Sequence, residues 1–105
     1  LHLSRELKEY IVNIVDATRN PKDYGLDDYG KYIQFGGSPR ATINIALSAK
    51  ATALLNGRVF VTPDDIKSVA KEVLRHRVLL NYEGKAREIS TDDVIDEILK
   101  RIPVL

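Results

Sequence analysis

The stretch Gly36-Gly37-Ser38-Pro39-Arg40 decides the fold, because a long apolar helix is predicted to begin inside it. The two glycines are expected to give the backbone freedom just before the helix. Ser38 is a favoured N-cap residue, and Pro39 suits the first helical position, where no N–H is needed. Arg40 has the wrong charge for a first helical turn, where a cation costs about 0.3–1 kcal/mol. An arginine there would make sense if an anion such as a phosphate binds at the helix start; a surface arginine lying over its neighbours is the alternative.

The helix that follows is predicted over residues 39–55, and Asn56-Gly57 would end it. Lys50 is its only charged residue after Arg40, and the other side chains leave no wide polar face. A helix that is apolar most of the way round is normally buried, so we expect this helix to be the central one of the domain. Its apolar residues are Ile43, Ile45, Ala46, Leu47, Ala49, Ala51, Ala53, Leu54 and Leu55.

Three further helices are predicted from their start signals and apolar periodicity. They cover residues 5–19 after Ser4, residues 63 to about 74–78 after Thr62, and residues 91–102 after Ser90. Residues 79–89 are expected to form a loop, and apart from an extended link near Phe60 no strand is predicted. The sequence therefore predicts an all-α fold, a single domain over residues 1–105. We expect a small bundle of about four helices, within a range of three to five, around the helix at 39–55.

Residues 20–37, NPKDYGLDDYGKYIQFGG, form a long connection for a compact domain. Such length indicates function or disorder, and the many aromatic residues argue against disorder. Either these rings fold back onto the core, with a turn of helix near 26–32, or they dock onto another domain or subunit. The aromatic residues, which are therefore interface candidates, are Tyr24, Tyr29, Tyr32 and Phe35.

The composition excludes several kinds of chemistry. The formal net charge is +1 with no cysteine, so neither a basic nucleic-acid-binding stripe nor a thiolate metal site is expected. His2 and His76 are isolated, and the acidic pairs at 64–65 and 92–93 stand where helix starts favour negative charge. No phosphate-binding loop and no membrane span is visible. By itself the chain is expected to be inactive as an enzyme, and because it begins at Leu1 we expect a piece of a longer protein.

The run GGSPRATINIALSAKATALLNGRVFVTPDDIKSVAKEVLRHRVLL resembles the C-terminal lid of MoxR-type AAA+ ATPases. Those lids carry a pair of small residues and Ser-Pro-Arg before an apolar helix, followed by a Gly-Arg link, a V-T-P-D-D helix start and a V-L-x-H-R helix end. The upstream YIVNIVDATRNP resembles the first lid helix, so the likeness extends roughly from Tyr10 to Leu80. Gly37 departs from the pattern, since an alanine is common at that position.

The resemblance implies a role for Arg40 as the "sensor 2" arginine, which reaches the γ-phosphate of ATP held by a separate α/β domain upstream. Residues Gly36, Gly37, Ser38 and Pro39 would support it, and the upstream domain would hold Mg²⁺. Arg19 is a secondary candidate for contact with that domain or a neighbouring subunit. The resemblance also implies a homo-oligomeric ring, typically a hexamer, that acts in the cytoplasm as a chaperone-like remodeller, in some cases with von Willebrand factor A-type partners.

Three alternatives stay open. The chain could be the lid of a magnesium-chelatase-type subunit, which shares the later helix pattern. It could be a small DNA-binding module whose helix at 63–78 enters a groove through Arg75, His76 and Arg77, although the near-neutral charge counts against this. It could also be a protein-interaction module that docks through the segment from Tyr24 to Phe35.

Overall fold

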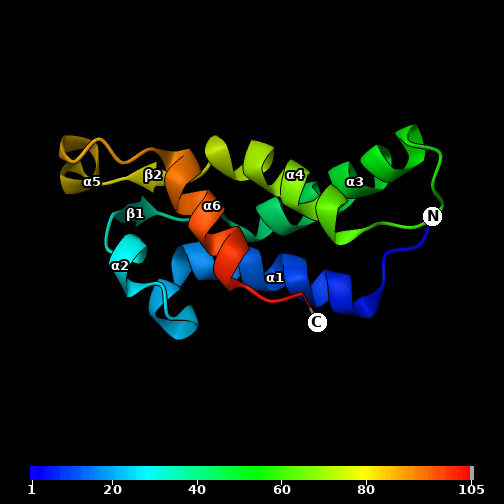
Figure 1. Ribbon diagram of the computed structural model, residues 1–105, viewed down its shortest axis with the longest axis horizontal. Coiled ribbons are helices and arrows are strands. Elements are labelled where there is room, and N and C mark those ends of the chain that lie inside the picture. The colour runs from blue at the N-terminus through cyan, green and yellow to red at the C-terminus, as the bar shows by residue number, and fades with distance from the viewer. Residues whose placement is uncertain (105) are drawn as a thin grey trace.

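The structure, a computed structural model, describes residues 1–104 and, among these, every side chain except that of Phe35. Helices dominate, and the predicted all-α class is confirmed (Figure 1). The long helices are α1 (Arg5–Arg19), α3 (Pro39–Leu55), α4 (Pro63–Arg75) and α6 (Thr91–Arg101). The shorter elements are η1 (Pro21–Tyr24), α2 (Asp27–Gly30), β1 (Ile33–Phe35), β2 (Leu79–Leu80) and α5 (Tyr82–Ala86).

The starts of the long helices agree with the predicted caps. Ser4 Oγ accepts a hydrogen bond from the Leu7 N–H at 3.2 Å. Before α4, Thr62 Oγ1 accepts from the Asp65 N–H at 3.3 Å while Asp65 Oδ2 accepts from the Thr62 N–H at 2.9 Å. The same reciprocal pair precedes α6, between Ser90 and Asp93. These capping boxes account for Asp65 and Asp93, whose carboxylates accept hydrogen bonds from the N–H groups of the N-cap residues.

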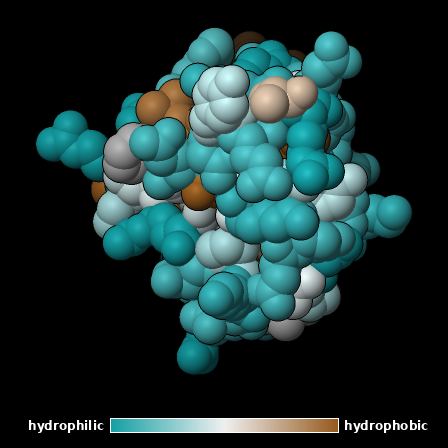
Figure 2. Space-filling view, turned by 90° about the vertical axis from the view of Figure 1, so that its left-hand side faces the viewer, coloured by the Kyte–Doolittle hydropathy of each residue, from teal (hydrophilic) through white to brown (hydrophobic). Residues whose placement is uncertain are grey.

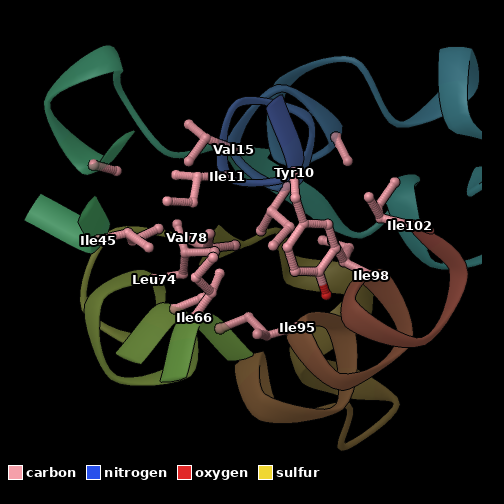
Figure 3. Close-up of a cluster of buried hydrophobic side chains, with 14 of the residues drawn as sticks. Tyr10, Ile11, Val15, Ile45, Ile66, Leu74, Val78, Ile95, Ile98 and Ile102 are labelled. Atoms are coloured by element: carbon pink, nitrogen blue, oxygen red, sulfur yellow. The ribbon is translucent and has the colours of Figure 1, made fainter. Parts of the chain in front are cut away.

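The core lies where α1, α3, α4 and α6 meet. The helix α3 packs against both α4 and α1, and α6 crosses over α1 and α4 (Figure 1). Figure 3 shows Tyr10 and Ile11 of α1 pointing at side chains from the facing helices, among them Ile66, Leu74 and Ile98. Each of these five side chains is at most 1% exposed. Burial of that kind is the main favourable term that holds such a small domain together.

The helix α3 has the predicted bounds and, as predicted, a central place between α1 and α4, but the expectation that it is buried is wrong for one of its sides. Its buried residues recur every four positions, and most of them are alanines: Ala41, Ile45, Ala49 and Ala53. On the opposite side, Ile43 is 59% exposed, Leu47 59% and Leu54 65%. The reason is that α1 and α4 cover only one side of this helix, and a second apolar side remains open to solvent.

The expectation of a loop over residues 79–89 and of no strand is also wrong. Ile33 pairs with Leu80 and Phe35 with Leu79 in a two-stranded antiparallel sheet, and α5 follows directly. Asn81 joins these pieces, since its side chain donates to the Lys31 carbonyl at 2.7 Å and accepts from the Gly84 N–H at 2.9 Å. Strands of two or three residues are too short to show a periodic pattern in the sequence.

The tyrosine-rich segment folds back onto the domain, and α2 is the helical turn predicted near 26–32. Tyr32 is 6% exposed, Tyr24 and Tyr29 pack against the core, and the Tyr24 hydroxyl donates to Asp16 Oδ2 at 2.7 Å. The interpretation that the aromatic rings fold back onto the core is therefore confirmed for these three tyrosines. Tyr32 is too deeply buried to contact a partner. The predicted role of the Phe35 side chain lies outside the described part.

The end of the molecule that carries α2 and α5 presents mainly hydrophilic side chains (Figure 2). Leu79 of β2 and Tyr82 of α5 are nevertheless exposed, at 53% and 87%, and further exposed apolar side chains lie on α3 and the link after it. Within residues 1–104 no helix is both long and apolar enough to cross a bilayer.

Candidate functional site

The candidate site is the junction at which α3 begins, and Gly36 and Gly37 are what allow it to form. The Gly37 N–H donates a hydrogen bond to Thr18 Oγ1 at 2.8 Å, in the last turn of α1. A Cβ atom on Gly36 would lie 2.4 Å from the Thr18 carbonyl oxygen, and one on Gly37 would lie 3.0 Å from Leu74 Cδ2 of α4. Neither glycine has positive φ, unlike Gly25 and Gly57. The pair therefore serves close packing, and the expected need for backbone freedom is wrong.

Ser38 occupies the N-cap position of α3, with extended backbone angles, as predicted. Its side chain makes no capping hydrogen bond; instead its carbonyl oxygen accepts from the Ala41 N–H at 2.9 Å. Pro39 is the first helical residue, and both Ser38 and Pro39 are exposed. The exposed start of α3 is thus left without the side-chain cap that α4 and α6 have.

Arg40 is exposed and, within the described part of the chain, forms no ion pair. It stands three residues before Ile43 and seven before Leu47, so these side chains share one side of α3. Leu54 stands seven residues after Leu47, about two turns further along the helix, and so continues the same row. We call Ile43, Leu47 and Leu54 the outer stripe. Arg40 therefore lies at the end of an exposed apolar row, on the same rigid helix.

On one side of the outer stripe, a groove of about 350 Å³ runs between α1 and α3. Arg19, the exposed last residue of α1, lines this groove together with Pro39 and Ile43. The groove also contains Asp16, whose pKa is lowered by the hydrogen bonds from the Tyr24 hydroxyl and the Asn20 amide. Arg19 makes no ion pair with Asp16, so its guanidinium remains available beside the start of α3.

On the other side, a groove of about 500 Å³ runs between α3 and α4. Its lining includes Asn44 and Leu47 from α3, and Glu72, His76 and Arg77 from the end of α4 and the turn after it. Asn44 is four residues after Arg40 and so follows it on the same side of α3. Arg77 is exposed and lies outside every ion pair formed by residues 1–104. Sequence reasoning did not group Arg77 with Arg40, because the packing of Gly37 against Leu74, which brings the end of α4 to the start of α3, joins residues far apart in the sequence.

The structure separates the three basic residues of the DNA-binding alternative. Arg75 binds Asp92 of α6 through two nitrogens, at 2.9 and 3.1 Å, and also Glu72 at 3.0 Å. These bonds raise the pKa of Arg75 and lower that of Asp92. Arg75 thus holds α4 to α6, and only His76 and Arg77 face outward.

The exposed guanidinium groups at this site are suited to binding an anion. No group of three or more acidic, histidine or cysteine side chains that could hold a metal ion occurs among the described residues. A guanidinium offers paired N–H donors that match the oxygens of a phosphate. The junction can therefore recognise an anion presented from outside the chain.

Comparisons with known proteins agree with this picture. The family pattern described as "AAA lid domain" matches residues 30–98. "Chaperone MoxR1" of Mycobacterium tuberculosis is 42% identical over 96 residues, and "Protein MoxR" of Paracoccus denitrificans is 36% identical over 109 residues. These matches cover 91% and 98% of this chain but 26% and 32% of the relatives, so the chain spans about a quarter to a third of their length.

A crystal structure of a "putative ATPase" from Cytophaga hutchinsonii superimposes with a TM-score of 0.94 and 46% sequence identity. The match covers 98% of this chain and 31% of that one. The fold described above therefore occurs, almost complete, as one part of a longer chain.

Proposed function

Because the chain belongs to the AAA lid domain family, we propose that it works as the C-terminal lid of a MoxR-type ATPase, with Arg40 as its sensor 2 arginine. In this proposal an α/β domain upstream binds ATP and Mg²⁺, and Arg40 contacts the γ-phosphate. The observation that carries the proposal is the position of Arg40, exposed and unpaired at the start of α3 within the described part of the chain. A cation at that helix end is unfavourable unless an anion is bound nearby.

The outer stripe gives the upstream domain a surface to rest on. Ile43, Leu47 and Leu54 are each at least 59% exposed and lie in a row that begins at Arg40. Exposed apolar rows of this kind mark contact surfaces, and a domain that offers the γ-phosphate to Arg40 would cover the same side of α3. We therefore assign the outer stripe to the contact with the nucleotide-binding domain.

Coupling to motion follows from the rigidity of this arrangement. Arg40 and the outer stripe belong to one helix, and Gly37 anchors the start of that helix to α1 and α4. When hydrolysis removes the γ-phosphate, the helix would lose a charge-assisted contact and the lid could rotate as a unit. Hydrolysis would in this way become relative motion of two domains.

The wider setting is proposed from the resemblance. We propose a homo-oligomeric ring that acts as a chaperone-like remodeller in the cytoplasm, with von Willebrand factor A-type proteins as partners in some cases. One relative, MoxR1, carries the name chaperone. The residues of this chain suit contact with the phosphates of ATP, and the upstream domain would supply the Mg²⁺ ligands.

The test is steady-state ATP hydrolysis by the untruncated gene product, wild type beside Arg40→Ala. We expect a loss of roughly tenfold or more, equivalent to about 1.4 kcal/mol of lost stabilisation. Arg87→Ala is the matched control, because Arg87 is exposed just after α5 and, among the described residues, its ion-pair partner is Glu83. If the two variants hydrolyse ATP at the same rate, Arg40 is a surface arginine and the sensor role is wrong.

A further inference from the structure

We propose that Arg19, Arg40 and Arg77 act together as one site for a chain of phosphates, so that Arg40 has two guanidinium partners that the sensor role does not include. We call these three residues the arginine cluster. The identification of the ligand as the phosphates of a nucleotide rests on the proposed function; the existence of the site rests on the geometry of this chain.

The first argument is that the cluster collects the unneutralised arginines. The chain has eight arginines. Among the described residues, the ion pairs with carboxylates involve Arg5, Arg58, Arg75, Arg87 and Arg101. The remaining three are Arg19, Arg40 and Arg77, and all of them are exposed. Unpaired arginines scattered over a surface would need no explanation. These three, however, each stand at or beside the end of a long helix: the last residue of α1, the first turn of α3 and the turn after α4.

The second argument is that one residue brings these helix ends together. Gly37 donates to Thr18 Oγ1 at 2.8 Å, and a Cβ built on it would lie 3.0 Å from Leu74 Cδ2. Arg19 follows Thr18 directly, and Arg40 and Arg77 each stand three residues after Gly37 and Leu74. Each arginine of the cluster therefore lies within three residues, along the chain, of a residue that packs at Gly37.

The third argument concerns the carboxylates nearby. Asp16 lies in the groove of Arg19 but is bound by Tyr24 and Asn20, and Glu72 lies in the groove of Arg77 but is bound by Arg75. Both acids are thus hydrogen-bonded to other side chains, although the charge of Arg19 also contributes to the lowered pKa of Asp16. Three guanidinium groups on neighbouring helix ends leave an excess of positive charge, which a multivalent anion would neutralise. A polyphosphate carries several charges along its length and can contact more than one guanidinium.

The test uses this chain with inorganic tripolyphosphate as the probe, at constant ionic strength, and follows the arginine Nε–Hε signals by NMR. We expect the signals of Arg19, Arg40 and Arg77 to shift together, with one common dissociation constant in the millimolar range. Arg5 and Arg87, which are exposed and weakly paired, are the internal controls. If Arg19 or Arg77 shifts no more than these controls, the proposed site is wrong.

Substitutions provide a second, independent measurement. Arg77→Ala and Arg19→Ala are each expected to weaken tripolyphosphate binding by about threefold or more, while Arg87→Ala leaves it unchanged. Neither Arg19 nor Arg77 is buried, so the variants should fold, and thermal unfolding checks this. Loss of hydrolysis in Arg40→Ala together with an unresponsive Arg77 would overturn the cluster and keep the sensor role. Tripolyphosphate binding by all three arginines together with unchanged hydrolysis in Arg40→Ala would support the cluster and overturn the sensor role.

Discussion

The amide of Gly37 donates a hydrogen bond to Thr18 Oγ1 at 2.8 Å, and the same hydroxyl donates to the Val15 carbonyl oxygen at 2.6 Å. Through this pair the start of α3 is fixed to the last turn of α1. The side chain that projects from that start, Arg40, therefore has a defined position relative to the whole domain. Rigid support of this kind is what a binding residue needs in order to act with precision.

The hydrogen bond itself makes the first prediction. Thr18→Val keeps the shape of the side chain but removes the acceptor, which leaves the buried Gly37 N–H without a partner. We expect a loss of about 1–3 kcal/mol in the free energy of unfolding, measured by urea denaturation. Thr18→Ser retains the hydroxyl and should lose clearly less. Equal stability of the valine variant and the wild type would contradict the role of this contact.

The two glycines should differ in their tolerance of alanine. A Cβ on Gly36 would meet a backbone oxygen at 2.4 Å, whereas one on Gly37 would meet the end of a leucine side chain at 3.0 Å. We expect Gly36→Ala to destabilise the chain by about 1–3 kcal/mol, as overpacking does, and Gly37→Ala to have a smaller effect. Thermal unfolding of both variants under one condition decides this. A more damaging change at position 37 would mean that the junction is packed differently.

The outer stripe should contribute little to the stability of this chain. Because Leu47 is 59% exposed, we expect Leu47→Ser to change the free energy of unfolding by no more than about 0.5 kcal/mol. Ile45, on the other side of α3, is 0% exposed, and Ile45→Ala should cost about 2–5 kcal/mol. Urea denaturation measures both. A large loss in the Leu47 variant would show that α3 is buried on both sides.

Acid should weaken the attachment of α4. Burial alone raises the pKa of Asp65, but hydrogen bonds from the Thr62 N–H and the Arg58 guanidinium outweigh it, so the pKa lies below its ordinary value. A carboxylate whose pKa is lowered by folding contributes stability at pH values above its unfolded pKa of about 3.9, and this contribution disappears as the pH falls through the folded pKa. We therefore expect stability to fall steadily below about pH 4.

The control for this effect is Asp65→Asn, which cannot titrate. Its free energy of unfolding should depend less on pH between about pH 2 and pH 5 than that of the wild type. Part of the dependence should remain, because the pKa values of Asp16, Asp28, Asp92 and Asp93 are also lowered. The same pH dependence in both proteins would show that Asp65 does not stabilise the fold through its charge.

The helix boundaries could be predicted from the sequence because local chemistry determines them. Thr62 and Ser90 accept hydrogen bonds from residues three positions later, and Pro39 and Pro63 occupy first helical positions. Signals of this kind depend on neighbours in the chain. The position of Arg40 followed for the same reason, since the start of α3 fixes it.

What could not be predicted depends on contacts between distant residues. The apolar pattern of α3 indicates that two of its sides favour contact with other apolar surfaces. It does not identify what contacts the second side, which is exposed in this chain. The close approach of Gly36 to Thr18, eighteen positions away in the sequence, has no local signal, and neither does the neighbourhood of Arg77 and the start of α3. The strands β1 and β2 carry no local signal, because they exist only through their pairing.

The central claim is that Arg40 contacts the γ-phosphate, and the most direct test compares ATP with ADP. Equilibrium binding of both nucleotides would be measured on the untruncated protein, wild type and Arg40→Ala, with Arg87→Ala as control. The account predicts that Arg40→Ala weakens ATP binding by roughly tenfold, about 1.4 kcal/mol, and leaves ADP binding nearly unchanged. If ATP and ADP lose affinity equally, or neither does, Arg40 does not sense the γ-phosphate and the account is contradicted.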